Sequence, residues 1–321
     1  MDIVSTGQLK AQSISFQVSD RTLCNGSCRC CISRTTPNTA GMRDKKVTRC
    51  SLNDVEKGLH FAKRVGATHA ILTGKAEPTQ EPERYISDLI YTCRSERFLV
   101  DMHTNGFLLQ NNICGDYTLK RLAKAGLTMI TFSVFSDNLA VHRDITGLTV
   151  DFESLIREAN RLGLLVRVSL VLSQAGVGNY NDVIEFIHHF GNLGVHMVVI
   201  RELWIPSHAA MIGKECAAKV FEWNKANLVK LHEIVPHFED MASKAHKSIV
   251  WAAAPIYRLA PLPWGAPVFA MEGCFDDPEH GVNVTFALCE ENDKGPVMKS
   301  IVHKPNGHGY RNWDFNANIL Y

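Results

Sequence analysis

The stretch Cys24-Asn-Gly-Ser-Cys28-Arg-Cys30-Cys31 decides how the rest of this sequence is interpreted. Cys24, Cys28 and Cys31 have the spacing C-x3-C-x2-C, and three thiolates this close in sequence can converge on one soft metal centre. Four thiolates complete an iron–sulfur cubane, so three leave one iron open to a ligand from outside the chain. A zinc ion would need a fourth protein ligand. The spacing therefore favours an iron–sulfur cluster, with a zinc site or a reduced cysteine cluster as the alternative.

The chain before the cysteines predicts where the cluster lies. Residues 13–19 alternate between apolar and polar side chains, which is the pattern of a strand. Asn25, Gly26 and Ser27 are turn formers that allow the backbone to wrap around a cluster. We therefore expect the cysteines in a loop at the end of a first strand.

Composition limits the classes of protein that this chain can belong to. It has 321 residues, of which 45% are hydrophobic, a net charge of +1 and ten cysteines, and its mean hydropathy is −0.07. We expect no signal peptide, no membrane helix and no strong nucleic-acid surface. Ten cysteines without a secretion signal fit a reducing compartment, so a cytoplasmic location is expected.

Strands and helices alternate along the first two thirds of the sequence. After the first strand, further strands are predicted at residues 69–73, 98–102, 128–133, 164–172 and 195–203, with helices at 55–65, 82–95, 117–125, 152–162 and 180–190. Short connections of this kind predict parallel strands with right-handed helical crossovers. The predicted fold is α/β, a partial (β/α)6 TIM-like barrel, because six units are fewer than the eight of a closed barrel.

Polar residues follow or end several of these strands, where parallel sheets bind ligands. Gly74-Lys-Ala76-Glu77-Pro78 follows the second strand and His103-Thr-Asn105-Gly106 follows the third. The remaining candidates are Ser133 and Ser136 at the fourth strand, Arg167 on the fifth and Arg201 at the end of the sixth.

The cysteine spacing and the order of these motifs resemble the radical S-adenosylmethionine (SAM) superfamily over about residues 12–205. The resemblance implies that Cys24, Cys28 and Cys31 bind a [4Fe–4S] cluster whose open iron holds the amino and carboxylate groups of SAM. It implies SAM contacts at Ala76 and Glu77 for the ammonium, directly or through the turn's backbone. Asn105, Ser133 and Ser136 are expected near the ribose, and Arg167 is expected to pair with the SAM carboxylate.

Three features differ from the family pattern or extend it. Arg201 is expected to contact either SAM or substrate. Cys30 stands where the family usually has an aromatic residue, so it could rival Cys31 as a ligand. The segment His142-Arg-Asp-Ile-Thr-Gly147 resembles the H-x-x-I-x-G segment of the molybdenum-cofactor cyclase and peptide-modifying branch.

The expected function is reductive cleavage of SAM to a 5′-deoxyadenosyl radical, which abstracts hydrogen from a small metabolite, a nucleotide or a peptide. The resemblance also implies an electron donor such as flavodoxin or ferredoxin. The alternative is a non-catalytic protein that uses the cysteines for a structural zinc or iron–sulfur centre.

Residues 206–321 are predicted to form a C-terminal extension that covers the barrel mouth and contacts substrate. A helix is expected at 214–231 and a strand at 282–288. Cys274 and Cys289 are interpreted as core or site-lining thiols, the alternative being an auxiliary cluster. The loop from His303 to His308, with Gly307 and Gly309, could be a metal loop, although a surface turn fits it better.

Overall fold

A parallel sheet forms the frame of the protein. The structure is a computed structural model that describes residues 9–18, 24–34, 49–110, 118–205, 215–245, 255–272, 280–287, 297–313 and 319–321. The first six strands lie side by side in chain order, and each pairs in parallel with the next. They are β1 (Lys10–Gln17), β2 (His69–Thr73), β3 (Leu99–Thr104), β4 (Met129–Val134), β5 (Leu165–Val171) and β6 (Met197–Arg201).

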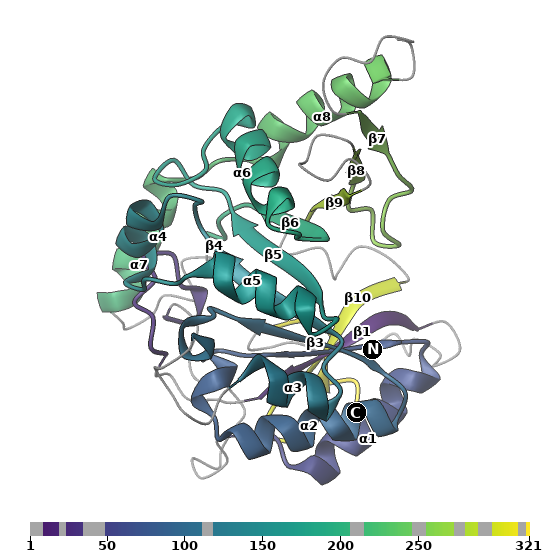
Figure 1. The fold of residues 1–321 in the computed structure, drawn as a ribbon. Helices are drawn as coiled ribbons and strands as arrows, with labels where there is room; N and C mark the ends of the chain where they lie inside the picture. Colours follow the sequence, from purple (N-terminus) through teal and green to yellow (C-terminus); the bar gives the residue numbers. More distant parts are fainter. Residues whose placement is uncertain are drawn as a thin grey trace.

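Helices connect these strands and cover the outer side of the sheet (Figure 1). They are α1 (Leu52–Arg64), α2 (Glu83–Ser95), α3 (Leu119–Ala125), α5 (Phe152–Arg161) and α6 (Tyr180–Asn192), with an additional short α4 (Leu139–Thr146) after β4. Local sequence explains many of the ends, because the side chains of Ser51, Thr118, Asp151 and Asn179 each accept a backbone N–H in the first turn of a helix. Gly126 ends α3 with a φ of 107°.

The two faces of the sheet differ in chemistry because side chains alternate along each strand. Residues that face the helices, such as Leu72, Val100, Ile130 and Val168, are fully buried. The opposite, concave face carries polar residues at the alternate positions. This inner row includes Ser13, Ser15, Asp101, His103, Thr131, Ser133, Arg167, Ser169 and Arg201. The prediction of a partial (β/α)6 TIM-like barrel is confirmed, and the barrel has a polar interior.

The C-terminal segment extends the same sheet at both edges. Strand β10 (Val297–His303) pairs in parallel with β1, and β9 (Gly281–Phe286) pairs in parallel with β6. Antiparallel β11 (Gly309–Tyr310) borders β10, while β8 (Val268–Glu272) and β7 (Ile256–Arg258) continue from β9. The predicted boundary at residue 205 therefore does not separate two sheets.

The helix predicted at residues 214–231 is present but ends five residues earlier, and a second helix begins at residue 231. Helix α7 covers Glu215–Ala226, and α8 covers Leu231–Ala245. The backbone N–H of Leu231 donates to the carboxylate of Glu202 at 3.1 Å. This cap comes from the end of β6, so the local pattern around residue 231 could not reveal it.

Helices α4 and α7 lie side by side at one end of the sheet (Figure 1). Trp223 of α7 and Val141 and Ile145 of α4 belong to one small apolar cluster with Cys30 of the cysteine loop. The loop, α4 and α7 thus meet at the ends of the strands.

The segment from His303 to Gly309 is the turn between β10 and β11. His303 is fully buried, and its Nδ1 lies 2.8 Å from the Tyr321 hydroxyl. In the described part of the chain, no group of three or more His, Cys, Asp or Glu side chains could enclose a single metal ion. Cys274 and Cys289 lie outside the described residues. No described helix is both long enough and apolar enough to cross a membrane.

Candidate functional site

The four cysteines of the loop after β1 have different surroundings. Cys24, Cys28 and Cys31 are partly exposed free thiols, whereas Cys30 is 7% exposed and packs against Phe135, Ile145 and Leu203. Cys30 thus occupies an apolar site formed by α4 and by the segments that follow β4 and β6. This burial favours Cys31 over Cys30 as the third ligand, and the ligand set stays a prediction.

The three partly exposed thiols lie close enough to influence one another. Burial raises the pKa of Cys28 to about 12, and the neighbouring Cys31 and Cys24 thiolates contribute to the rise. Burial also raises the pKa of Cys24, with Glu77 and Cys31 adding to it. A bound metal centre deprotonates its thiol ligands outright and would relieve this repulsion. Three soft sulfur donors close together in one loop fit a [4Fe–4S] cluster with one open iron.

The cysteine loop is attached to the end of α4. The backbone N–H groups of Ser27 and Arg29 donate to the carbonyls of Thr146 and Ile145 at 2.7 and 2.9 Å. Gly147 ends α4 with a φ of 76°, and a Cβ at this position would overlap the Ser27 hydroxyl. Glycine is thus required at residue 147 both for its backbone conformation and for the approach of the loop.

His142 and Ile145, the other two defined residues of the H-x-x-I-x-G segment, also have structural roles. His142 is 1% exposed, and its Nδ1 accepts the backbone N–H of Phe135 at 3.3 Å. Burial lowers the pKa of His142 to about 4, so the ring is neutral at pH 7 and can accept this bond. Ile145 packs against Cys30. The segment that resembled the family motif is therefore the support of the cysteine loop.

Glu77 joins the turns after β2 and β3. It is 5% exposed, and its carboxylate accepts from Thr79 N at 3.2 Å, Thr79 Oγ1 at 2.8 Å, Thr104 Oγ1 at 2.5 Å and Asn105 N at 2.7 Å. Burial raises the pKa of Glu77, while these four donors act in the opposite direction. The carboxylate already accepts four hydrogen bonds from the chain. This favours the expectation that Glu77 contributes to SAM binding through the backbone of its turn rather than by direct contact with the ammonium. The adjacent Ala76 is 9% exposed in the same turn.

Asn105 connects this clamp to the cysteine loop. Its Nδ2 donates to Asn25 Oδ1 at 2.8 Å and lies 3.9 Å from the Cys24 sulfur. Thr79, Glu77, Asn105 and Asn25 thus form one hydrogen-bonded series that ends at the expected cluster. The sequence predicted Glu77 and Asn105 as site residues but not that they bind each other.

Arg167 has a partner that the sequence analysis missed. Its guanidinium forms an ion pair with Asp101, which is 3% exposed, and its Nε donates to Thr131 Oγ1 at 3.0 Å. His103 Nε2 lies 3.1 Å from both the Asp101 carboxylate and Arg167 Nη2. The charge of Arg167 helps to lower the pKa of Asp101 to about 2 against the opposing effect of burial. The sequence does show an acidic residue, Asp101, inside the apolar run of β3. It does not show the partner, because Arg167 lies two strands away on β5.

The remaining predicted residues do not form one group. Ser136 is 5% exposed, and its Oγ accepts the backbone N–H of Asn138 at 3.1 Å just before α4. Ser133 lies on the concave face, partly exposed. Arg201 lies at the end of β6, and its Nε is enclosed without a hydrogen-bond partner in the described part of the chain.

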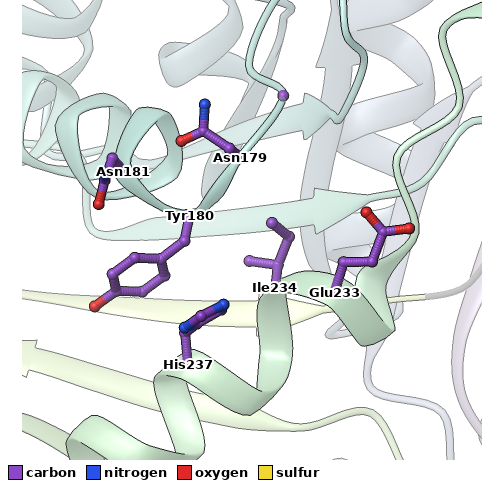
Figure 2. A pocket seen from close by; sticks show the side chains of 7 residues that line it. Asn179, Tyr180, Asn181, Glu233, Ile234 and His237 are labelled. Carbon is purple, nitrogen blue, oxygen red and sulfur yellow. The ribbon is translucent and has the colours of Figure 1, made fainter.

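A separate hollow of about 380 Å³ lies between the start of α6 and α8 (Figure 2). The rings of Tyr180 and His237 face each other there at 4.9 Å. The polar groups at the start of α6 bind one another, because Asp182 accepts from Gly178 N and Asn179 Nδ2. We therefore assign no ligand to this hollow, which contains no predicted site residue.

Comparison with known proteins identifies one family and several similar structures. A family model described as the radical SAM superfamily matches residues 21–189, and no curated protein matches the chain. The solved structure of Streptococcus suis SuiB bound to S-adenosylmethionine is similar, with 14% identity and a TM-score of 0.58 over 97% of this chain and 63% of that one. Escherichia coli HemN, a coproporphyrinogen III oxidase described as a radical SAM enzyme, has 10% identity and a TM-score of 0.43 over 84% of this chain and 68% of that one.

These similarities have different weight. The chain spans 63% of the length of SuiB, and at 14% identity that likeness shows the fold alone. The family match covers more than half of the 321 residues. The cofactors of the family are a [4Fe–4S] cluster and SAM, which the cysteine loop fits. The chain therefore belongs to the radical SAM superfamily.

Proposed function

We propose that this protein reductively cleaves SAM and uses the resulting 5′-deoxyadenosyl radical to abstract a hydrogen atom from a substrate. The observation that carries the proposal is the loop at the end of β1, where three thiols are partly exposed and Cys30 is turned into an apolar cluster. When bound, the cluster and SAM together supply the electron transfer and the radical.

The chain's own residues position these groups. Cys24, Cys28 and Cys31 would hold three irons and leave the fourth open for SAM. The series from Glu77 through Asn105 to Asn25 fixes the loop against the ends of β2 and β3. The concave face below offers polar side chains to a substrate, and an enclosed barrel keeps water away from a reactive intermediate.

The C-terminal segment is proposed to cover the barrel mouth and to contact substrate. Trp223 of α7 and Leu228 pack against the cluster that contains Cys30, which brings this segment to the cysteine loop. The substrate is proposed to be a small metabolite, a nucleotide or a peptide, and the electron donor a small protein such as flavodoxin or ferredoxin. A reducing compartment such as the cytoplasm suits the six free thiols among the described residues. The non-catalytic alternative is not favoured, because the chain belongs to a family of enzymes.

Product analysis after anaerobic reconstitution tests the proposal. The reduced protein should convert SAM to methionine and 5′-deoxyadenosine, both measured by mass spectrometry. A variant with Cys24, Cys28 and Cys31 replaced by Ala should form neither product. Cys93→Ala, which changes a buried thiol of α2, should retain both the iron and the activity. A colourless zinc-containing protein, or 5′-deoxyadenosine formation that survives loss of the three cysteines, would refute it.

A further inference from the structure

Two hydroxyl groups on the concave face have no hydrogen-bond partner among the residues that the structure describes. Ser133 of β4 and Ser169 of β5 are register partners on adjacent strands, so both side chains point to the same face. Both are partly exposed. Neither hydroxyl has a hydrogen bond to any residue that the structure describes, whereas the nearby Thr131 hydroxyl donates to Asp101. Ser133 and Ser169 are therefore available to a ligand.

Arg201 adds a positive charge to the same face. It is the register partner of Val171, two residues beyond Ser169 on β5. Its Nε is enclosed without a hydrogen-bond partner, and its guanidinium forms no ion pair with the described residues. The charge of Arg201 contributes to lowering the pKa of His103 on β3, after burial as the main cause. Arg201 and His103 thus lie on the same concave face of the sheet.

The nearby acidic side chains already have other partners. Asp101 is paired with Arg167. Glu202, which follows Arg201 in sequence, lies 3.3 Å from Lys230 Nζ and accepts the backbone N–H of Leu231. Arg201 is consequently a cation without a counter-charge from these carboxylates, in a place where water is partly excluded. A guanidinium in this state matches a carboxylate or a phosphate, which it can bind through two parallel hydrogen bonds.

We propose that Arg201, with the hydroxyl of Ser169, binds an anionic group of the substrate, either a carboxylate or a phosphate, while the Ser133 hydroxyl is left to the SAM ribose. This inference rests on the proposed function and adds the chemical class of the substrate. The methionine part of SAM is expected at the cysteine loop, where Asn105 of the β3 turn contacts Cys24. Strand β6 lies three strands further along the sheet, about 14 Å at the usual strand spacing. The position of Arg201 therefore favours a substrate group over the SAM carboxylate.

The test uses inorganic phosphate and acetate as probes for the two anion classes. Each is titrated by calorimetry into the anaerobically reconstituted protein, with and without saturating SAM. Phosphate or acetate should bind the wild type in both states. Arg201→Gln should weaken that binding by about tenfold to a hundredfold, the range for a charged hydrogen bond. Ser169→Ala should weaken anion binding by a smaller factor. This second variant still tests the proposal if Arg201→Gln does not fold.

Arg157→Gln is the matched control. Arg157 is an exposed arginine of α5 that pairs with Glu153, so its loss should leave anion binding unchanged. Equal binding by the wild type and Arg201→Gln would overturn the proposal. It would also be overturned if SAM abolished anion binding and Arg201→Gln weakened SAM binding at least tenfold, because the site would then hold the SAM carboxylate. Formation of 5′-deoxyadenosine by the wild type, measured separately, shows whether the proposed function itself holds.

Discussion

Replacement of Gly147 by Ala should detach the cysteine loop from α4. The substitution has two free-energy costs, and a second glycine of the chain allows them to be measured separately. A left-handed backbone conformation costs a residue with a Cβ about 1–2 kcal/mol. The added Cβ would also displace Ser27, and with it the two backbone hydrogen bonds of Ser27 and Arg29 to α4, worth about 1 kcal/mol each.

Gly163 provides the matched control. It follows α5 with a φ of 72°, close to the 76° of Gly147, but nothing lies within 4 Å of a Cβ built there. Gly163→Ala should therefore have only the backbone cost. The difference between the two variants should be about 1–2 kcal/mol, which corresponds to about tenfold weaker retention of the cluster.

Iron and sulfide content after anaerobic reconstitution, and the rate of iron loss to a chelator, measure this difference. Gly147→Ala should lose iron about tenfold faster than Gly163→Ala, with urea unfolding as the check on global stability. Adding Ser27→Ala removes the overlapping hydroxyl and should restore much of the iron in Gly147→Ala. If both glycine variants retained iron equally, or if Ser27→Ala gave no rescue, the proposed support of the loop by α4 would be wrong.

Two further predictions follow from the site. Cys30→Ala should retain most of the iron, because that thiol lies in an apolar cluster, whereas Cys31→Ala should lose it; the reverse pattern in iron analysis would exchange the two ligand assignments. Asp101→Asn should lower the free energy of unfolding by about 3–5 kcal/mol, because it leaves the Arg167 charge unpaired in a mostly buried site. A double-mutant cycle with Arg167→Gln should show strong coupling, and additive effects would exclude the ion pair as the cause. The folded-state pKa of Asp101 is about 2, below its ordinary 3.8, so its contribution is fully present above pH 3.8 and is lost as the pH falls toward 2. The difference between the wild type and Asp101→Asn in urea unfolding should therefore be constant between about pH 6 and 8.

Local patterns predicted the parts of this protein that depend on neighbouring residues in the sequence. The spacing of Cys24, Cys28 and Cys31 indicated the cluster, and apolar runs placed β1 to β6 within a few residues. The helix ends at Ser51 and Gly126 are local in the same sense, because capping depends on residues within one turn. The alternation of strands and helices was sufficient for a parallel sheet and a partial barrel.

Contacts between distant segments were decided by the tertiary structure alone. The pairing of Asp101 with Arg167 joins side chains 66 positions apart, and the attachment of Ser27 to the end of α4 spans 119 positions. The addition of β10 to β1 and of β9 to β6 likewise depends on which sheet edge is open once the first six strands have paired. The type of a residue and the face of the strand on which it lies follow from the local sequence. The residue that it contacts on another strand depends on how the sheet curves. The sequence therefore identified Glu77, Asn105, Arg167 and Arg201 as candidates, and only the folded chain distinguished the arginine with a carboxylate partner from the one without.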